Sequence, residues 1–162
     1  MAGIPIYSTA IQPEWIDYNG HVRDAYYGVI VSSAIDALMD RVGLDEGYRT
    51  RSGCTIYTLE MHLNYLQEMQ QSDTAMVHLR VAGLDHKRIL AAFEIVRSGK
   101  PGVAATAEVM LLHVRRAADK VASAAFPPQV SSALAELQAA SAGLPADGPG
   151  SRRMELRPHT RA

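Results

Sequence analysis

The 162-residue sequence is poor in cysteine, carries almost no net charge and contains no long apolar run. Its single cysteine, Cys54, excludes an internal disulfide framework and is typical of a reducing compartment. A formal net charge of −1 gives no electrostatic reason to expect binding to nucleic acid or to an anionic membrane. No apolar run reaches about 18 residues, and the first residues lack the regions of a signal peptide. We therefore expect a soluble, cytoplasmic protein without nucleic-acid or membrane partners.

Motifs of several enzyme classes are also missing. There is no glycine-rich phosphate loop and no Gly-x-Ser-x-Gly nucleophile elbow. Four histidines are spread over predicted strands and a hairpin tip without the close spacing of metal ligands, namely His62, His78, His86 and His113. We therefore expect no metal site and no bound cofactor.

A short polar turn that runs into a long apolar helix, over residues 13–42, is the most informative stretch. The turn contains Asp17, Asn19, Gly20 and His21. Helical spacing puts one set of apolar residues on a single stripe: Tyr27, Ile30, Val31, Ala34, Leu38 and Val42. Asp24 is the predicted N-cap and Gly43 the predicted end. The pattern predicts a buried helix roughly 27 Å long over residues 25–42.

The rest of the chain is typical of antiparallel strands. A short strand is predicted over residues 7–12, and a polar connection over 44–53. From Thr55 the residues alternate, which predicts a strand with Tyr57, Leu59, Met61, Leu63 and Tyr65 on one face and Thr58, Glu60, His62 and Asn64 on the other. Strands are also predicted over 75–81, 88–97 and 103–114, the last of them central because it is almost apolar on both faces.

This order of elements indicates an α+β fold. A single flat sheet cannot bury a long apolar helix, so we expect a curved antiparallel sheet wrapped around one central helix. Residues 1–128 are the predicted domain, and residues 129–162 a C-terminal helix and tail. Within that segment a short surface helix is predicted over 130–140, followed from residue 143 by a tail rich in Gly, Pro and Arg.

Asp17 is the candidate catalytic residue. Its position before the helix can put a carboxylate beside the free N–H groups of the first helical turn. Such donors suit the oxyanion of an attacked thioester, and the carboxylate can attack directly or activate water. A thiolate leaves readily, so no strong general acid is needed. From spacing alone, however, Asp-x-x-Gly before a helix is better interpreted as a structural turn.

Residues 17–27, Asp-Tyr-Asn-Gly-His-Val-Arg-Asp-Ala-Tyr-Tyr, resemble the Asp-x-x-Gly-His-Val-Asn-Asn-x-x-Tyr signature of hotdog-fold thioesterases of the 4-hydroxybenzoyl-CoA thioesterase type. The resemblance covers roughly residues 5–128 and implies an acyl-CoA thioesterase. It implies a catalytic carboxylate at Asp17, oxyanion donors from the backbone near residues 22–24, and a site at the interface of a homodimer or homotetramer. The candidate catalytic set is Asp17, Gly20, His21 and Asp24, with His21 positioning the turn. Arg23-Asp24 departs from the usual Asn-Asn pair, which leaves the polarity of the acyl pocket open.

A narrower resemblance concerns thioesterases of carnitine breakdown, which hydrolyse acyl-CoA esters that carry a trimethylammonium group, such as betainyl-CoA. It rests on residues 57–66, 85–88, 112–114 and 126–127. A quaternary ammonium favours aromatic faces and a carboxylate. The substrate-binding candidates are Trp15, Asn19, Tyr26, Tyr27 and Glu60, with Tyr18 as a further aromatic. The same aromatics could equally be core or interface residues, and Glu60 an ordinary solvated charge.

Two alternatives remain open. One is a thioesterase for another short, medium-chain or aromatic acyl-CoA, or for an acyl carrier protein. The other is a non-catalytic module that binds acyl-CoA. At the hairpin tip, Lys87 and Arg88 could contact the phosphates of coenzyme A, although a solvated charge pair is the better interpretation.

Overall fold

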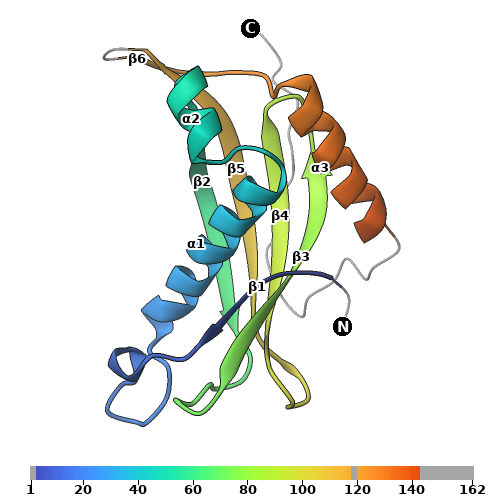
Figure 1. The fold of residues 1–162 in the computed structure, drawn as a ribbon. Helices are drawn as coiled ribbons and strands as arrows, with labels where there is room; N and C mark the ends of the chain where they lie inside the picture. The colour runs from blue at the N-terminus through green and yellow to red at the C-terminus, as the bar shows by residue number, and fades with distance from the viewer. Residues whose placement is uncertain (1–2, 118–119, 143–162) are drawn as a thin grey trace, which may run out of the picture.

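The computed structural model describes residues 3–117 and 120–142, which form one curved antiparallel sheet with three α-helices (Figure 1). The strands are β1 (Ile4–Ala10), β2 (Cys54–Tyr65), β3 (Thr74–Leu84), β4 (Arg88–Arg97), β5 (Val103–Ala117) and β6 (Lys120–Ser123). The helices are α1 (Asp24–Arg41), α2 (Glu46–Ser52) and α3 (Pro128–Ser141), with a 3-10 turn at Pro13–Trp15. The strand order is β1-β3-β4-β5-β2, and β6 pairs with β5. The expected α+β architecture is confirmed.

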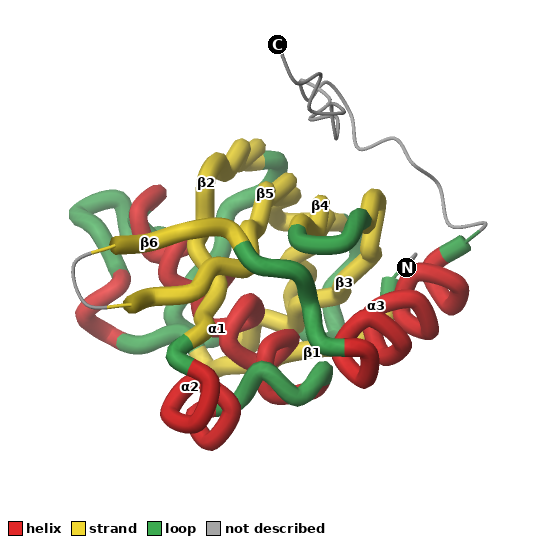
Figure 2. Tube along the Cα trace, turned by 90° about the horizontal axis from the view of Figure 1, so that it is seen from above, coloured by secondary structure: helices red, strands yellow, loops and turns green. Residues whose placement is uncertain are grey.

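The sheet curls around α1, as Figure 2 shows from above. Every residue of the predicted apolar stripe is buried, and Ile35 and Met39 widen the stripe. The stripe packs against the alternate residues of β3, β4 and β5 that face it, including Leu79, Phe93 and Val109. β5 lies between β4 and β2, so its predicted central position is confirmed. The helix ends as predicted, because Gly43 has a positive φ of 84° and Leu44 donates a hydrogen bond to the Met39 carbonyl.

Two local expectations were wrong, and one strand was not predicted. The connection over 44–53 contains α2, because the Asp45 side chain accepts the Tyr48 N–H (2.7 Å) and Gly53 closes the helix in a left-handed conformation. β6 follows β5 where no strand was predicted. The helix over 130–140 is not a surface helix, because Val130, Leu134 and Leu137 of α3 join the main core. The predicted tail from residue 143 lies outside the described residues.

The alternation in β2 is interrupted by a bulge between Thr58 and Glu60. Thr58 pairs with Leu111, a core residue that faces α1, whereas Glu60 pairs with Met110, whose neighbours Val109 and Leu111 both face the core. Residues paired across two strands share a face, so Thr58 faces α1 and Glu60 faces away from it. The predicted single apolar face was therefore wrong, since Tyr57 and Met61 lie on opposite faces.

None of the helices in the described ranges is long and apolar enough to span a membrane.

Candidate functional site

The turn around Asp17 is a tight hairpin that delivers the chain to the start of α1. Ile16 and Val22 form an antiparallel bridge, and Asp17 N–H donates to the His21 carbonyl over 2.9 Å. Gly20 N–H donates to the Asp17 carbonyl over 3.0 Å. Gly20 has a φ of 80°, which glycine adopts without steric cost. The turn predicted from the sequence is therefore present, and Gly20 is its conformational requirement.

The Asp17 carboxylate is held by backbone donors of its own turn. Its Oδ1 accepts the N–H of Asn19 at 2.8 Å and that of His21 at 3.3 Å. Partial desolvation acts to raise the pKa of Asp17, but these two hydrogen bonds, together with the Asn19 side chain and the nearby His21, hold the pKa below its usual value. Asp17 is therefore a carboxylate at neutral pH, as a nucleophile or general base must be. Asn19 lies on the exposed tip of the turn.

The segment over residues 67–70 supports the turn from outside. His21 Nε2 lies 3.1 Å from Glu68 Oε2, and Val22 N–H donates to the Met69 carbonyl over 2.8 Å. His21 therefore contacts both Asp17, through its backbone N–H, and Glu68, through its ring. Glu68 becomes connected to Asp17 through a single residue.

The start of α1 differs from the expectation. The helix begins with Asp24, so the N-cap is Arg23, and the prediction of Asp24 as the cap was wrong. Arg23 has an extended backbone and no capping side chain, while Asp24 Oδ1 accepts the next N–H, that of Ala25, at 2.8 Å. The amide of Arg23 donates to the Trp15 carbonyl over 2.9 Å.

These bonds decide which amide can polarise a carbonyl. The N–H groups of Val22 and Arg23 are already bonded to protein carbonyls. Asp24 N–H has no acceptor within the described part of the chain, because a first helical residue has no partner in its own helix. Of the three amides expected near residues 22–24, Asp24 is the one whose donor remains available.

The aromatic candidates separate into three groups. Trp15 and Tyr26 stack on each other, with ring centroids 5.5 Å apart and an interplanar angle of 16°. Tyr18 is almost fully exposed on the turn. Tyr27 is only 4% exposed and contacts Tyr65 edge to face, with centroids 5.3 Å apart. Tyr27 is therefore mainly a core residue, and Tyr65 is the aromatic that borders solvent beside it.

A pocket of about 270 Å³ opens at the start of α1. We call it the helix-start pocket; its lining residues are Val22, Asp24, Tyr27, Tyr65, Leu66, Gln67 and Glu68. Asp17 lies outside this lining and reaches it through His21, which contacts Glu68. Tyr65 and Glu68 were not predicted as site residues. Tyr65 ends the alternating run of β2, which could have pointed to an inward aromatic, whereas Glu68 had no distinguishing signal in its polar segment.

Glu60 lies elsewhere. It faces away from α1, and its Oε1 lies 2.8 Å from Nε2 of His62. Five residues of strand separate it from Tyr65, which is about 17 Å along β2. Within one protomer the structure does not bring Glu60 to the turn that carries Asp17.

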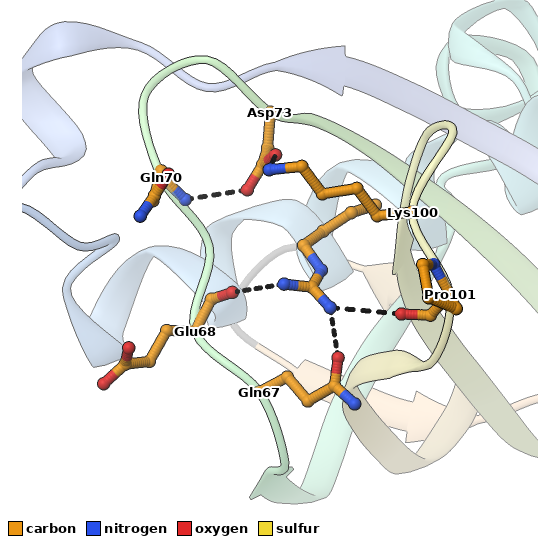
Figure 3. A network of polar contacts seen from close by, with 7 residues as sticks. Gln67, Glu68, Gln70, Asp73, Lys100 and Pro101 are labelled. Carbon is orange, nitrogen blue, oxygen red and sulfur yellow. Dashed lines mark hydrogen bonds and ion pairs between the residues drawn. The ribbon is translucent and has the colours of Figure 1, made fainter.

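The segment that supports the turn is anchored to the β4–β5 hairpin (Figure 3). Arg97 donates from Nη1 to the Glu68 carbonyl (3.2 Å) and from Nη2 to the Pro101 carbonyl (3.1 Å) and the Gln67 side chain. Asp73 forms an ion pair with Lys100 and accepts the Gln70 N–H at 2.9 Å. These contacts hold both ends of the segment over residues 67–73.

The charged residues at the tip of the β3–β4 hairpin contact other residues of the same chain. Arg88 forms an ion pair with Asp85, Nη2 to Oδ2 2.7 Å, and Lys87 Nζ donates to Ser123 Oγ at 3.2 Å. These contacts favour a structural charge pair over a phosphate site. Across residues 3–117 and 120–142, no three or more His, Cys, Asp or Glu side chains gather where they could hold a metal ion.

Comparison with known proteins shows to which family the chain is similar. Residues 11–134 match the model of the Thioesterase-like superfamily. The chain is 40% identical over 139 residues to a betainyl-CoA thioesterase of Pseudomonas aeruginosa, covering 86% of each chain. It is 37% identical over 137 residues to an L-carnitine dehydrogenase/betainyl-CoA thioesterase of Agrobacterium fabrum, of which it spans 28%.

Solved structures resemble the whole chain. A candidate thioesterase of Pseudomonas putida KT2440 superposes with a TM-score of 0.78 at 36% identity, over 98% of this chain and 99% of that one. The protein SAV2348 of Staphylococcus aureus, solved in complex with CoA, has a TM-score of 0.80 at 25% identity, over 97% and 98% of the two chains.

Proposed function

Since this chain belongs to the Thioesterase-like superfamily and is an acyl-CoA thioesterase of the hotdog fold, we propose that it hydrolyses betainyl-CoA or a related trimethylammonium acyl-CoA, with Asp17 as its catalytic carboxylate. One observation carries the catalytic assignment. The ionised Asp17 precedes a helix start at which one N–H, that of Asp24, has no acceptor in the described residues. The substrate is proposed because the relative that is 40% identical is a betainyl-CoA thioesterase.

The proposed chemistry uses these two groups together. The Asp24 N–H donates to the thioester oxygen as negative charge develops on it. Asp17 then either attacks the carbonyl carbon or removes a proton from an attacking water. In both routes a C–O bond forms, the C–S bond breaks, and one water supplies the hydroxyl of the acid and the proton of the CoA thiol. Arg23, the residue that departs from the family signature, contributes no backbone donor because its N–H is bonded to the Trp15 carbonyl.

We further propose that the active unit is a homodimer formed along β2. Within the described residues β2 pairs only with β5, so its other edge presents unpaired N–H and C=O groups. Exposed apolar side chains accompany this edge, namely Leu59, Tyr65 and Leu66, with Val29 on α1. A second copy paired along β2 would cover them and bring its own residues toward the helix-start pocket. The one cysteine is free and buried, which is compatible with the cytoplasmic location that we propose.

Thiol release from a panel of acyl-CoA esters tests the function. The panel contains betainyl-CoA, a neutral short-chain ester, benzoyl-CoA and a long-chain ester, with wild type beside Asp17→Asn. We expect a preference for betainyl-CoA, and a loss of about 10²-fold or more in kcat/KM for Asp17→Asn, which keeps the shape and removes the charge. Asp36→Asn, an exposed aspartate on α1, is the matched control and should retain activity. If Asp17→Asn keeps wild-type activity, or if wild type releases thiol from none of the esters, the proposed function is ruled out.

A further inference from the structure

We propose that the helix-start pocket holds the quaternary ammonium group of the acyl chain, with the ring of Tyr65 and the carboxylates of Glu68 and Asp24 as its partners. This inference rests on the proposed function, and it adds the residues that select a cationic acyl group. Asp24, the residue whose N–H is available, is one of the residues that line the pocket, and the lining combines aromatic and acidic side chains.

The covalent structure of the substrate determines where such a group must lie. In a betainyl thioester one methylene separates the ammonium nitrogen from the carbonyl carbon, so the two atoms are about 2.5 Å apart, as N and C are in an amino acid. The cation therefore has to bind next to the group that polarises the carbonyl. The pocket meets this condition because Asp24 both lines it and carries the unbonded N–H. Glu60, about 17 Å along β2 from Tyr65, does not meet it within the same protomer.

The pocket has room for the group. A cavity of about 150 Å³ binds benzene, which has six heavy atoms. The 270 Å³ of the helix-start pocket therefore accommodates the four heavy atoms of a trimethylammonium group.

Tyr65 supplies a fixed aromatic surface. Its side chain is 52% exposed although its ring edge packs at 84° against the buried Tyr27. Its hydroxyl donates to the Asp24 carbonyl over 3.3 Å, which ties the ring to the helix start. A cation over a tyrosine ring gains about 0.5–2 kcal/mol, depending on how far it is desolvated.

The charges around the pocket favour a cation. Asp24 and Glu68 contribute two carboxylates, and none of the seven lining residues is Lys or Arg. Burial raises the pKa of Tyr65 and the nearby Asp24 charge raises it further. For Tyr27, burial also raises the pKa; Met69 N–H and Arg97 act against it, while Glu68 adds to it. The charge of Asp24 at Tyr65 and that of Glu68 at Tyr27 thus have the sign that attracts an ammonium, and Arg97 opposes Glu68 at Tyr27.

The test compares two thioesters of the same shape, betainyl-CoA and 3,3-dimethylbutyryl-CoA, in which carbon replaces the charged nitrogen. The measured quantity is the charge preference, the ratio of their kcat/KM values. We expect wild type to favour the cation, and Tyr65→Leu and Glu68→Gln each to reduce the ratio by about 3- to 30-fold. Tyr65→Phe keeps the ring and should restore most of the preference. Asp36→Asn, which removes an equal charge from the exposed face of α1, is the control and should leave the ratio unchanged, while Glu60→Gln tests the rival carboxylate on β2.

The outcomes separate the two proposals. If wild type prefers betainyl-CoA while the ratio stays within twofold in both Tyr65→Leu and Glu68→Gln, the pocket assignment is overturned and the thioesterase function stands. If the ratio shifts only in Glu60→Gln, the pocket assignment is likewise overturned and the thioesterase function stands. Equal hydrolysis of the two esters by wild type also overturns the pocket assignment. If wild type hydrolyses neither ester, the proposed function fails as well. Should Tyr65→Leu not fold, Glu68→Gln on its exposed side chain decides the question.

Discussion

Two aspartates, Asp17 in the turn and Asp73 in the segment over residues 67–73, are both kept ionised by their neighbours. Asp17 is kept ionised by two backbone N–H groups of its own hairpin. Asp73, whose side chain is 2% exposed, is kept ionised by Lys100 and by Gln70 N–H. Desolvation acts to raise the pKa of each, and in both cases hydrogen bonds outweigh it and lower the pKa. A carboxylate near the surface and a buried one are thus stabilised by the same means.

The pH profile of kcat/KM should reflect Asp17. A base works in its deprotonated form, so the rate should rise with pH through the pKa of Asp17. Because that pKa lies below the ordinary 3.8, we expect kcat/KM to stay flat from pH 7 to about 5 and to fall only in strong acid. Initial rates in buffers of constant ionic strength measure this. An acidic limb centred near pH 6 would show that another group controls the reaction.

Asp73→Asn should destabilise the fold. The substitution removes the charge that Lys100 and Gln70 N–H stabilise in a buried position, so we expect the free energy of unfolding to fall by about 1–3 kcal/mol. Since the folded pKa of Asp73 is lowered, its contribution is present above the unfolded pKa and is lost as pH falls through the folded pKa.

Urea denaturation at neutral pH and in acid measures both effects. The difference between wild type and Asp73→Asn should shrink below about pH 4. Asp36→Asn on the exposed face of α1 is the matched control and should cost less than about 0.5 kcal/mol.

At the scale of elements, the segment over residues 67–73 links parts of the chain that are distant in sequence. Arg97 at the end of β4 binds the Glu68 carbonyl, and the next carbonyl, that of Met69, accepts Val22 N–H beside the turn that carries Asp17. The β4–β5 hairpin thereby positions the hairpin that carries Asp17. Glu68, whose side chain reaches His21 and the helix-start pocket, belongs to the same segment.

Arg97→Gln should therefore impair catalysis without removing any group that touches the substrate. Displacement of the segment by about 1 Å can reduce kcat up to about 10²-fold, because the carboxylate and the amide lose their alignment. We expect kcat to fall by more than KM rises, and Arg97→Lys to recover only part of the loss, since the single ammonium nitrogen of lysine lacks the planar fork that places Nη1 and Nη2 on different acceptors. Steady-state kinetics on the preferred ester measure the split. Lys120→Gln on β6 removes an exposed positive charge elsewhere and should have wild-type kinetics.

At the scale of the whole molecule, the sheet has two edge strands, and β2, one of them, has exposed apolar side chains. The path through the sheet begins with β1 and ends with β2. The β2 edge carries Leu59, the extra residue of the bulge, with its side chain exposed. A long unpaired strand with exposed apolar side chains invites pairing with another chain. This is the physical basis of the proposed dimer.

Leu59→Arg should convert the dimer into a monomer, because an arginine at the bulge adds charge to the centre of the proposed contact. We expect the mass measured by light scattering to halve at micromolar concentration, and activity to fall with it. Val121→Arg, at an equally exposed apolar residue on β6, is the control and should leave the mass unchanged. A wild-type protein that is monomeric and fully active would contradict the proposal.

What the sequence determined by itself was the part of the fold that neighbouring residues encode. The stripe of α1, the left-handed glycines at 20 and 43, and the strand periods on either side of the bulge in β2 follow from steric and hydrogen-bonding preferences of adjacent residues. The caps of α2 were also local, yet they lay in a polar segment without an apolar stripe, and the helix was missed.

Only the tertiary structure decided which side chains meet. The bulge at Leu59 puts Thr58 on the face of β2 that packs on α1 and Tyr57 on the opposite face, a change of register that alternation alone does not reveal. Tyr65 reaches Asp24 across 41 residues of sequence, and Glu68 reaches His21 because Arg97 anchors its segment. Such contacts depend on how strands pair and on which residues share the space beside a helix. Both are determined by the packing of the whole chain and not by any single stretch of it.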